Sequence, residues 1–197
     1  MSPDDSWGLT PMFGEDGWCR SCGTPLRDQC GPLIMRRAGL ARPEGAWTPN
    51  WRFDVLCLAE ELACLVASKF DVEVRPISWV GKSEPPAWQL VIPTVGSRWF
   101  DPVQLGERAS ARHGVAGESC QSCGIWRWMP VPTSELPQLT QDATMGGGDV
   151  AASPEWFGAG HQSYRKLVFR RGLAELLAEA SPKDFMNQDG ESGGSIL

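Results

Sequence analysis

The sequence predicts an α+β fold, with short antiparallel sheets and two or three helices around a four-cysteine centre of the zinc-ribbon kind. Three observations lead to this prediction. Two CxxCG motifs stand at residues 19–23 and 120–124, short strand-like segments alternate with apolar segments of helical spacing, and the two halves of the chain resemble each other.

Each CxxCG motif is expected to form a tight turn, here called a knuckle, that directs two thiolates toward one point. The glycine takes positive φ at little cost and lets backbone N–H groups approach the sulfur atoms. Two knuckles together supply the four ligands of a tetrahedral zinc site, which we predict to be Cys19, Cys22, Cys120 and Cys123. A closed shell of four thiolates leaves no position for water, so the predicted role of Zn²⁺ is structural.

Two other uses of these cysteines are open alternatives. Residues 18–22 read W-C-x-x-C, as in thiol oxidoreductases, where the first cysteine begins a helix that lowers its pKa. Residues 23–25 (Gly-Thr-Pro) are a poor helix start, and a second knuckle has no use in a redox dithiol. Cys30, eight residues after Cys22, is either a competing ligand or a surface thiol.

In the first half, residues 32–36 are strand-like and residues 39–50, with two prolines and two glycines, indicate a loop. Residues 53–69 carry apolar side chains at helical spacing, although the first few residues, 54–58, are equally typical of a strand that leads into a helix. Within a single helix, Cys57 and Cys64 would share one face as small core residues. Two strands at 72–79 and 88–95, joined by a proline-containing turn, predict a hairpin.

In the second half, Asp101 and Pro102 form a helix start, and that helix is expected to end near His113, whose imidazolium would favour the helix dipole. The other expected elements follow in chain order: a strand at 126–128, a long loop at 130–150, a helical turn at 153–155, a strand at 166–170 and a helix at 173–180.

An internal repeat connects the halves. Leu56, Leu62, Ala63, Leu65 and Ala67 recur as identical residues 111 positions later. Leucine and alanine are common in helices, so chance is the alternative to a duplication. A duplication would divide a single zinc-stapled domain (residues 1–188) into half-repeats 15–80 and 115–185 around a pseudo-twofold axis that joins the knuckles. Residues 189–197 are polar and glycine-rich, which predicts a disordered tail.

Composition narrows the classes of partner. A net charge of −6 makes nucleic acid an unlikely partner and is suited to a basic protein, including a basic toxin. No apolar run is long enough to span a membrane, and the first residues lack the pattern of a signal peptide, so we expect a cytoplasmic protein with reduced cysteines.

Ten tryptophans against one tyrosine predict a core built around indoles, each of which needs a partner for its N–H group.

The motifs that carry these predictions resemble the double-CXXCG motif family, best known from myxobacteria. The shared residues are Trp7-Gly8-Leu9, the knuckle from Trp18 to Gly23, the knuckle from Cys120 to Gly124, and the leucine-rich final helix. Some members of that family are immunity proteins for swarming-inhibition toxins. The resemblance therefore implies metal binding and a toxin-neutralising role.

Two classes of function follow. The first is a non-enzymatic zinc-binding protein that acts by protein–protein binding, as an immunity protein does. The second is an enzyme or nucleic-acid factor that uses the zinc ribbon as a scaffold. It would need a polar cleft near His161 with Asp149 or Glu155, or a basic groove of arginines at positions 36, 37, 165 and 170.

Overall fold

The computed structural model describes residues 8–36, 44–49, 52–81, 86–144, 148–182 and 194–196. Trp7, Arg37 and most of the predicted tail lie outside these ranges. Within them the chain forms four α-helices, one more than the upper limit predicted: α1 (Leu9–Phe13), α2 (Glu60–Lys69), α3 (Pro102–His113) and α4 (Arg171–Ala180). None of the helices in the described ranges is long and apolar enough to cross a membrane.

The strands form four small sheets, and most pairings are antiparallel, so the predicted α+β class is confirmed. The largest sheet has the order β2-β3-β6-β4, from β2 (Ala46–Trp47), β3 (Leu56–Ala59), β4 (Glu73–Pro76) and β6 (Ala87–Val91). A second has the order β9-β11-β12, from β9 (Val150–Ala152), β11 (Leu167–Arg170) and β12 (Gly194–Ile196).

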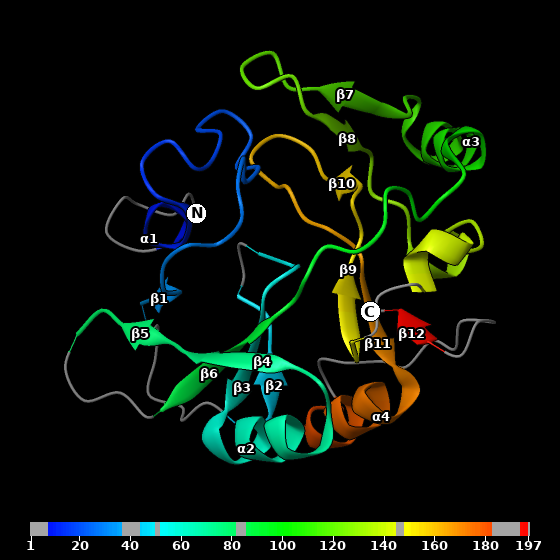
Figure 1. The fold of residues 1–197 in the computed structure, drawn as a ribbon. Helices are drawn as coiled ribbons and strands as arrows, with labels where there is room; N and C mark the ends of the chain where they lie inside the picture. Colours follow the sequence, from blue (N-terminus) through cyan, green and yellow to red (C-terminus); the bar gives the residue numbers. More distant parts are fainter. Residues whose placement is uncertain are drawn as a thin grey trace.

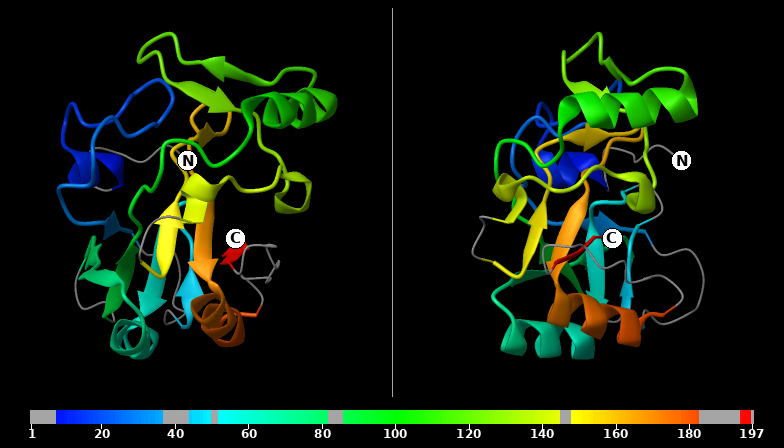
Figure 2. Two further views of the ribbon diagram at one scale, coloured as in Figure 1. Left: turned by 45° about the vertical axis from the view of Figure 1, so that its right-hand side comes forward. Right: turned by 90° about the vertical axis from the view of Figure 1, so that its right-hand side faces the viewer.

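The two remaining sheets each contain a parallel pairing, which the sequence did not predict. One is β1 (Ile34–Met35) with β5 (Ser78–Trp79), and the other has the order β10-β8-β7, from β7 (Gly117–Ser119), β8 (Trp126–Trp128) and β10 (Trp156–Phe157). Helices α2 and α4 lie side by side at one end of the molecule, and α3 with β7 and β8 lies at the other (Figures 1 and 2).

The apolar segment at 53–69 is a strand followed by a helix, which is the second of the two predicted readings. β3 passes directly into α2 at Ala59, whose backbone is extended (φ −65°, ψ 155°). The break separates two cysteines that a single helix would place on one face. Cys57 is fully buried in β3, whereas Cys64 is exposed on α2, so the prediction of two core cysteines is wrong for Cys64.

The predicted repeat has the same structure in both halves. β11 and α4 begin and end 111 residues after β3 and α2. The flanking strands also correspond, because β2 and β6 are antiparallel neighbours of β3, as β9 and β12 are of β11.

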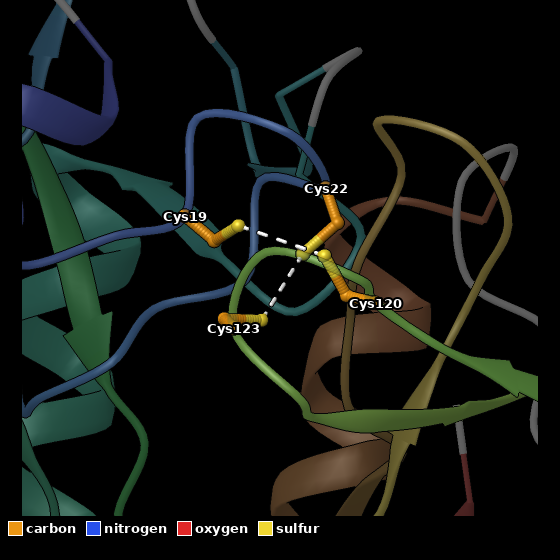
Figure 3. Close-up of side chains that lie close together, drawn as sticks. All are labelled: Cys19, Cys22, Cys120 and Cys123. Carbon is orange, nitrogen blue, oxygen red and sulfur yellow. Dashed lines mark hydrogen bonds between the residues drawn. The ribbon is translucent and has the colours of Figure 1, made fainter.

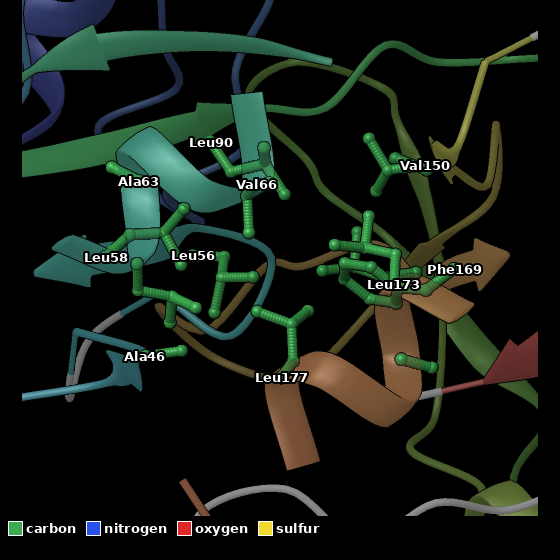
Figure 4. Close-up of a cluster of buried hydrophobic side chains, with 14 residues drawn as sticks. Ala46, Leu56, Leu58, Ala63, Val66, Leu90, Val150, Phe169, Leu173 and Leu177 are labelled. Atoms are coloured by element: carbon green, nitrogen blue, oxygen red, sulfur yellow. The ribbon is translucent and has the colours of Figure 1, made fainter. Parts of the chain in front are cut away.

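Equivalent residues of the two halves pack together in one core (Figure 4). Five buried residues from β3 and α2 have buried counterparts in β11 and α4: Leu56 with Leu167, Leu58 with Phe169, Leu62 with Leu173, Ala63 with Ala174, and Val66 with Leu177. The apolar side chains of the two strand–helix units are therefore buried against each other in one shared core.

The contacts at the ends of the two helices are reciprocal. The Ala46 N–H, at the start of β2, donates to Ser181 Oγ after α4 at 2.6 Å. The Asp71 N–H, after α2, donates to Asp149 Oδ2 before β9 at 2.6 Å. Each half therefore forms a hydrogen bond to a residue that follows the strand–helix unit of the other half.

Helix α3 matches its prediction. The Asp101 carboxylate accepts hydrogen bonds from the N–H groups of Val103 and Gln104 at 3.0 and 2.9 Å, and Pro102 occupies the first turn. Gly114 ends the helix in the left-handed conformation (φ 80°). These are the capping groups that an isolated helix end needs.

Three local predictions are wrong. Residues 153–155 form no helical turn, because the Glu155 carboxylate instead accepts hydrogen bonds from the N–H groups of Trp99 and Phe100 at 2.7 and 3.2 Å. Strand β2 lies within the predicted loop at 39–50. Strand β12 lies within the predicted disordered tail, where it pairs with β11.

The shared core predicts a clear difference between two leucines on the repeated helices. Leu173→Ala removes a fully buried side chain and should lower the free energy of unfolding by about 2–5 kcal/mol. Leu65→Ala, at an exposed position on α2, is the matched control and should change it by less than about 0.5 kcal/mol. Urea denaturation measures both, and equal losses would contradict the shared core.

Candidate metal centre

The first knuckle is a tight turn between two short extended segments. The Gly23 N–H donates to the Cys19 carbonyl at 2.8 Å, and the Cys19 N–H donates to the Thr24 carbonyl at 2.8 Å. Trp18 and Pro25 form a bridge across its base. Gly23 has φ 73°, a conformation that glycine takes at little cost.

The second knuckle repeats this geometry. The Gly124 N–H donates to the Cys120 carbonyl at 2.8 Å, and the Cys120 N–H donates to the Ile125 carbonyl at 3.0 Å. Ser119 and Trp126 pair across the base, at the positions that correspond to the first bridge, and φ of Gly124 is again 73°. The same five-residue pattern thus folds in the same way twice.

The four predicted ligands converge. Their sulfur atoms all lie within 4.8 Å of one another, although the knuckles are 101 residues apart in the chain (Figure 3). Cys19 and Cys120 are 3.7 Å apart at Sγ, and Cys22 and Cys123 are 3.8 Å apart. A tetrahedral ion with metal–sulfur bonds of about 2.3 Å has sulfur–sulfur edges of about 3.8 Å, so the spacing fits such an ion.

Burial and backbone hydrogen bonds shift the thiol pKa values in opposite directions. Burial raises the pKa of Cys22 to about 12 and also raises that of Cys123. The N–H groups of Cys123 and Ser122 lower the pKa of Cys120 to about 6. The backbone therefore favours the thiolate form of Cys120, whereas a cation that binds Cys22 and Cys123 must displace their protons.

Contacts outside the cysteines fix the two knuckles to each other. Ser21 Oγ and Ser122 Oγ, at equivalent positions of the two turns, are 2.7 Å apart. Thr24, which is fully buried, lies 2.7 Å from Ser163 Oγ and 3.1 Å from Cys22 Sγ through its Oγ1 atom. Sequence reasoning missed these residues, although the serine shared by both CxxCG motifs was a visible signal.

The other cysteines do not join the centre. Cys30 and Cys64 are exposed, and Cys57 is buried in β3, where burial raises its pKa. All seven cysteines lie in the described ranges and form no disulfide. Residues 23–33 contain no helix, so the geometry that would activate Cys19 as a redox thiol is missing from this part of the chain.

The two histidines have different surroundings. His113 Nε2 lies 2.8 Å from the Pro130 carbonyl, which ties the end of α3 to the following loop. His161 is exposed, and its carbonyl lies over Gly23 of the first knuckle. The carboxylates proposed as its partners have other contacts: Asp149 pairs with Arg170 at 3.0 Å, and Glu155 accepts from the N–H groups of Trp99 and Phe100.

Of the arginines predicted to line a basic groove, two have specific neighbours. The Arg165 guanidinium lies 4.2 Å from the centre of the Trp156 ring, and Arg170 forms the ion pair with Asp149. Arg36 is exposed, and Arg37 lies outside the described residues.

Comparison of the chain with family models, with curated proteins and with solved structures finds no match. The resemblance to the double-CXXCG motif family therefore stays a prediction from the knuckles and the segments around them.

The two knuckle glycines form a matched pair for mutation. Gly124→Ala places a methyl group in open space at φ 73°, so only backbone strain of about 1 kcal/mol is expected. In Gly23→Ala the same methyl group would lie 2.7 Å from the His161 carbonyl oxygen. We expect a further loss of about 1–3 kcal/mol in urea denaturation, because the backbone must shift. Equal losses would show that residues 160–163 do not pack on the first knuckle.

Proposed function

We propose that this chain is a non-enzymatic zinc-binding protein in which a structural four-cysteine site joins the two halves. The observation that supports the proposal is the convergence of four sulfur atoms from two identical turns, at spacings suited to a tetrahedral ion. Sulfur-only tetrahedral sites favour zinc or iron. Zinc is the ion that closed CxxC pairs of this kind most often hold, and it has no redox chemistry to control.

The energetic consequence of such an ion is large. A structural Zn²⁺ contributes about 10 kcal/mol or more to folding, which is comparable to the whole stability of a typical domain of about 5–15 kcal/mol. Zinc bound here would link residues 19–22 to residues 120–123 and hold the first half on the second. Its loss should therefore destabilise the protein as a whole, not one loop.

Native mass spectrometry of the purified chain tests this role. We expect one zinc ion per chain, its removal by a strong chelator, and a lower melting temperature of the metal-free protein. Cys120→Ser should abolish stoichiometric binding, whereas Cys30→Ser, at an exposed thiol outside the cluster, should retain it. A chain that carries no metal, or one equally stable with and without chelator, would contradict the proposal.

We further propose that the protein acts by binding a basic protein partner, and that this partner is of the toxin type. Three features support this proposal: the net charge of −6, the exposed aromatic side chains Phe53 and Trp126, and the resemblance of the knuckles to those of a family with immunity proteins. Opposite net charge accelerates association, and exposed aromatic residues are frequent anchors of interfaces.

Affinity capture from native lysate tests the partner. The tagged, zinc-loaded chain should retain a basic protein at low salt and release most of it at about 1 M salt, where charge attraction is screened. Mass spectrometry identifies the retained protein, and the tag alone is the control. The absence of any protein beyond that control, or capture of acidic proteins only, would contradict the proposal.

A further inference from the structure

A cavity of about 380 Å³ lies where the two halves of the chain meet, apart from the knuckle cysteines. Its walls come from the segment after the first knuckle, from the strands of the largest sheet, and from residues 152–165 of the second half. Cavities of about 300–1,000 Å³ with a few convergent polar groups are typical of small-molecule sites.

Arg52 is the first unusual group in this cavity. Its side chain is only 5% exposed, and Nη2 lies 2.7 Å from the Asp54 carboxylate. The Nε and Nη1 atoms are buried and have no hydrogen-bond partner in the part of the chain that the structure describes. A buried guanidinium with unpaired N–H groups is costly, because these groups lose water without gaining an acceptor.

Arg165 is the second unusual group in this cavity. It is half-buried, its guanidinium lies 4.2 Å from the centre of the Trp156 ring, and that of Arg52 lies 6.0 Å from the same centre. The buried Nε atom of Arg165 also has no partner among the described residues. Burial lowers the pKa of Arg165; Asp54 and Asp28 oppose this effect, and Arg52 adds to it.

Asp54 contacts both arginine residues. It pairs with the Arg52 side chain and accepts a hydrogen bond from the backbone N–H of Arg165 at 3.3 Å. The Arg52 guanidinium and the Arg165 backbone therefore contact the same carboxylate. By contrast, the nearby Gln29 and Gln89 amides bond to each other reciprocally at 2.9 and 2.8 Å and need no ligand.

The charged side chains that line the cavity have a net positive charge. Four arginines and two aspartates line the cavity, in a chain whose net charge is −6: Arg27, Asp28, Arg52, Asp54, Arg75 and Arg165. Arg75 is paired with Glu73, and the remaining three arginines exceed the two aspartates by one positive charge. A local excess of guanidinium groups in an acidic protein requires a specific explanation.

We propose that this cavity binds a small organic anion, whose carboxylate or phosphate oxygens pair with the free N–H groups of Arg52 and Arg165. The planar fork of a guanidinium matches these oxyanions better than any other side chain does. Val55, Leu90, Ile92 and the Trp156 ring supply an apolar wall for the organic part of the ligand. The site is separate from the metal centre and contains none of its ligands.

Isothermal titration calorimetry of the purified, metal-loaded chain in low-chloride buffer tests the proposal with three probes: phenyl phosphate, benzoate and inorganic phosphate. We expect phenyl phosphate or benzoate to bind at millimolar concentration or below, and inorganic phosphate to bind more weakly. Arg165→Gln should weaken binding about tenfold or more, and Arg98→Gln, at an exposed arginine outside the cavity, should leave it unchanged.

Arg52→Gln alone leaves Asp54 without its partner and risks unfolding, so the double variant Arg52→Gln/Asp54→Asn removes both charges and should also lose binding. In the parent chain, the Nε–H signals of the two arginines should move in ¹⁵N-resolved NMR spectra when the probe is added. No binding of any probe, or binding that Arg165→Gln does not weaken, would overturn the proposal. Equal affinity for inorganic phosphate and phenyl phosphate would overturn the organic part of it.

Discussion

The convergence of Cys19, Cys22, Cys120 and Cys123 is the constraint on which the remaining structure depends. The two knuckles are 101 residues apart in a chain of 197, so their approach closes about half of the chain into a loop. Loop-closure entropy grows slowly with length, by about 0.6 kcal/mol for each doubling, so a long loop costs little more than a short one. A tetrahedral ion bound by the four thiolates would contribute far more free energy than this loop closure costs, and the metal link would then fix the arrangement of the halves.

The second constraint is the approximate symmetry of the two halves. Strand–helix units with the same boundaries, 111 residues apart, contribute equivalent side chains to one core. Equivalent residues also meet at the metal centre, where Ser21 contacts Ser122. Contacts between equivalent residues are the mark of a twofold axis, here within one chain. The symmetry is not complete, because β4 and β5 have no counterpart among the described residues of the second half, and the arginine cavity uses different residues from each side.

The sequence predicts those parts of the structure that depend on residues close to one another in the chain. The CxxCG turns, the capped helix α3 and the strand–helix repeat all carry their signals within a few residues. A distant partner decides two of the predictions that the structure overturns. Glu155 looks like part of a helix start but bonds to the backbone at Trp99, and β12 becomes a strand only because β11 offers a free edge. The sequence likewise could not predict that Arg52 and Arg165 line one cavity, because the cavity is formed by segments of both halves that are distant in the chain.

The central claim is that sulfur atoms from both knuckles bind one ion. X-ray absorption spectroscopy at the zinc edge measures this most directly in the purified protein. If both knuckles bind one zinc ion, the spectrum should show a single shell of four sulfur atoms at about 2.3 Å, with no nitrogen or oxygen ligand. A first shell of nitrogen and oxygen, or of two sulfur atoms with two lighter ligands, would show that the knuckles do not share an ion and would contradict the account.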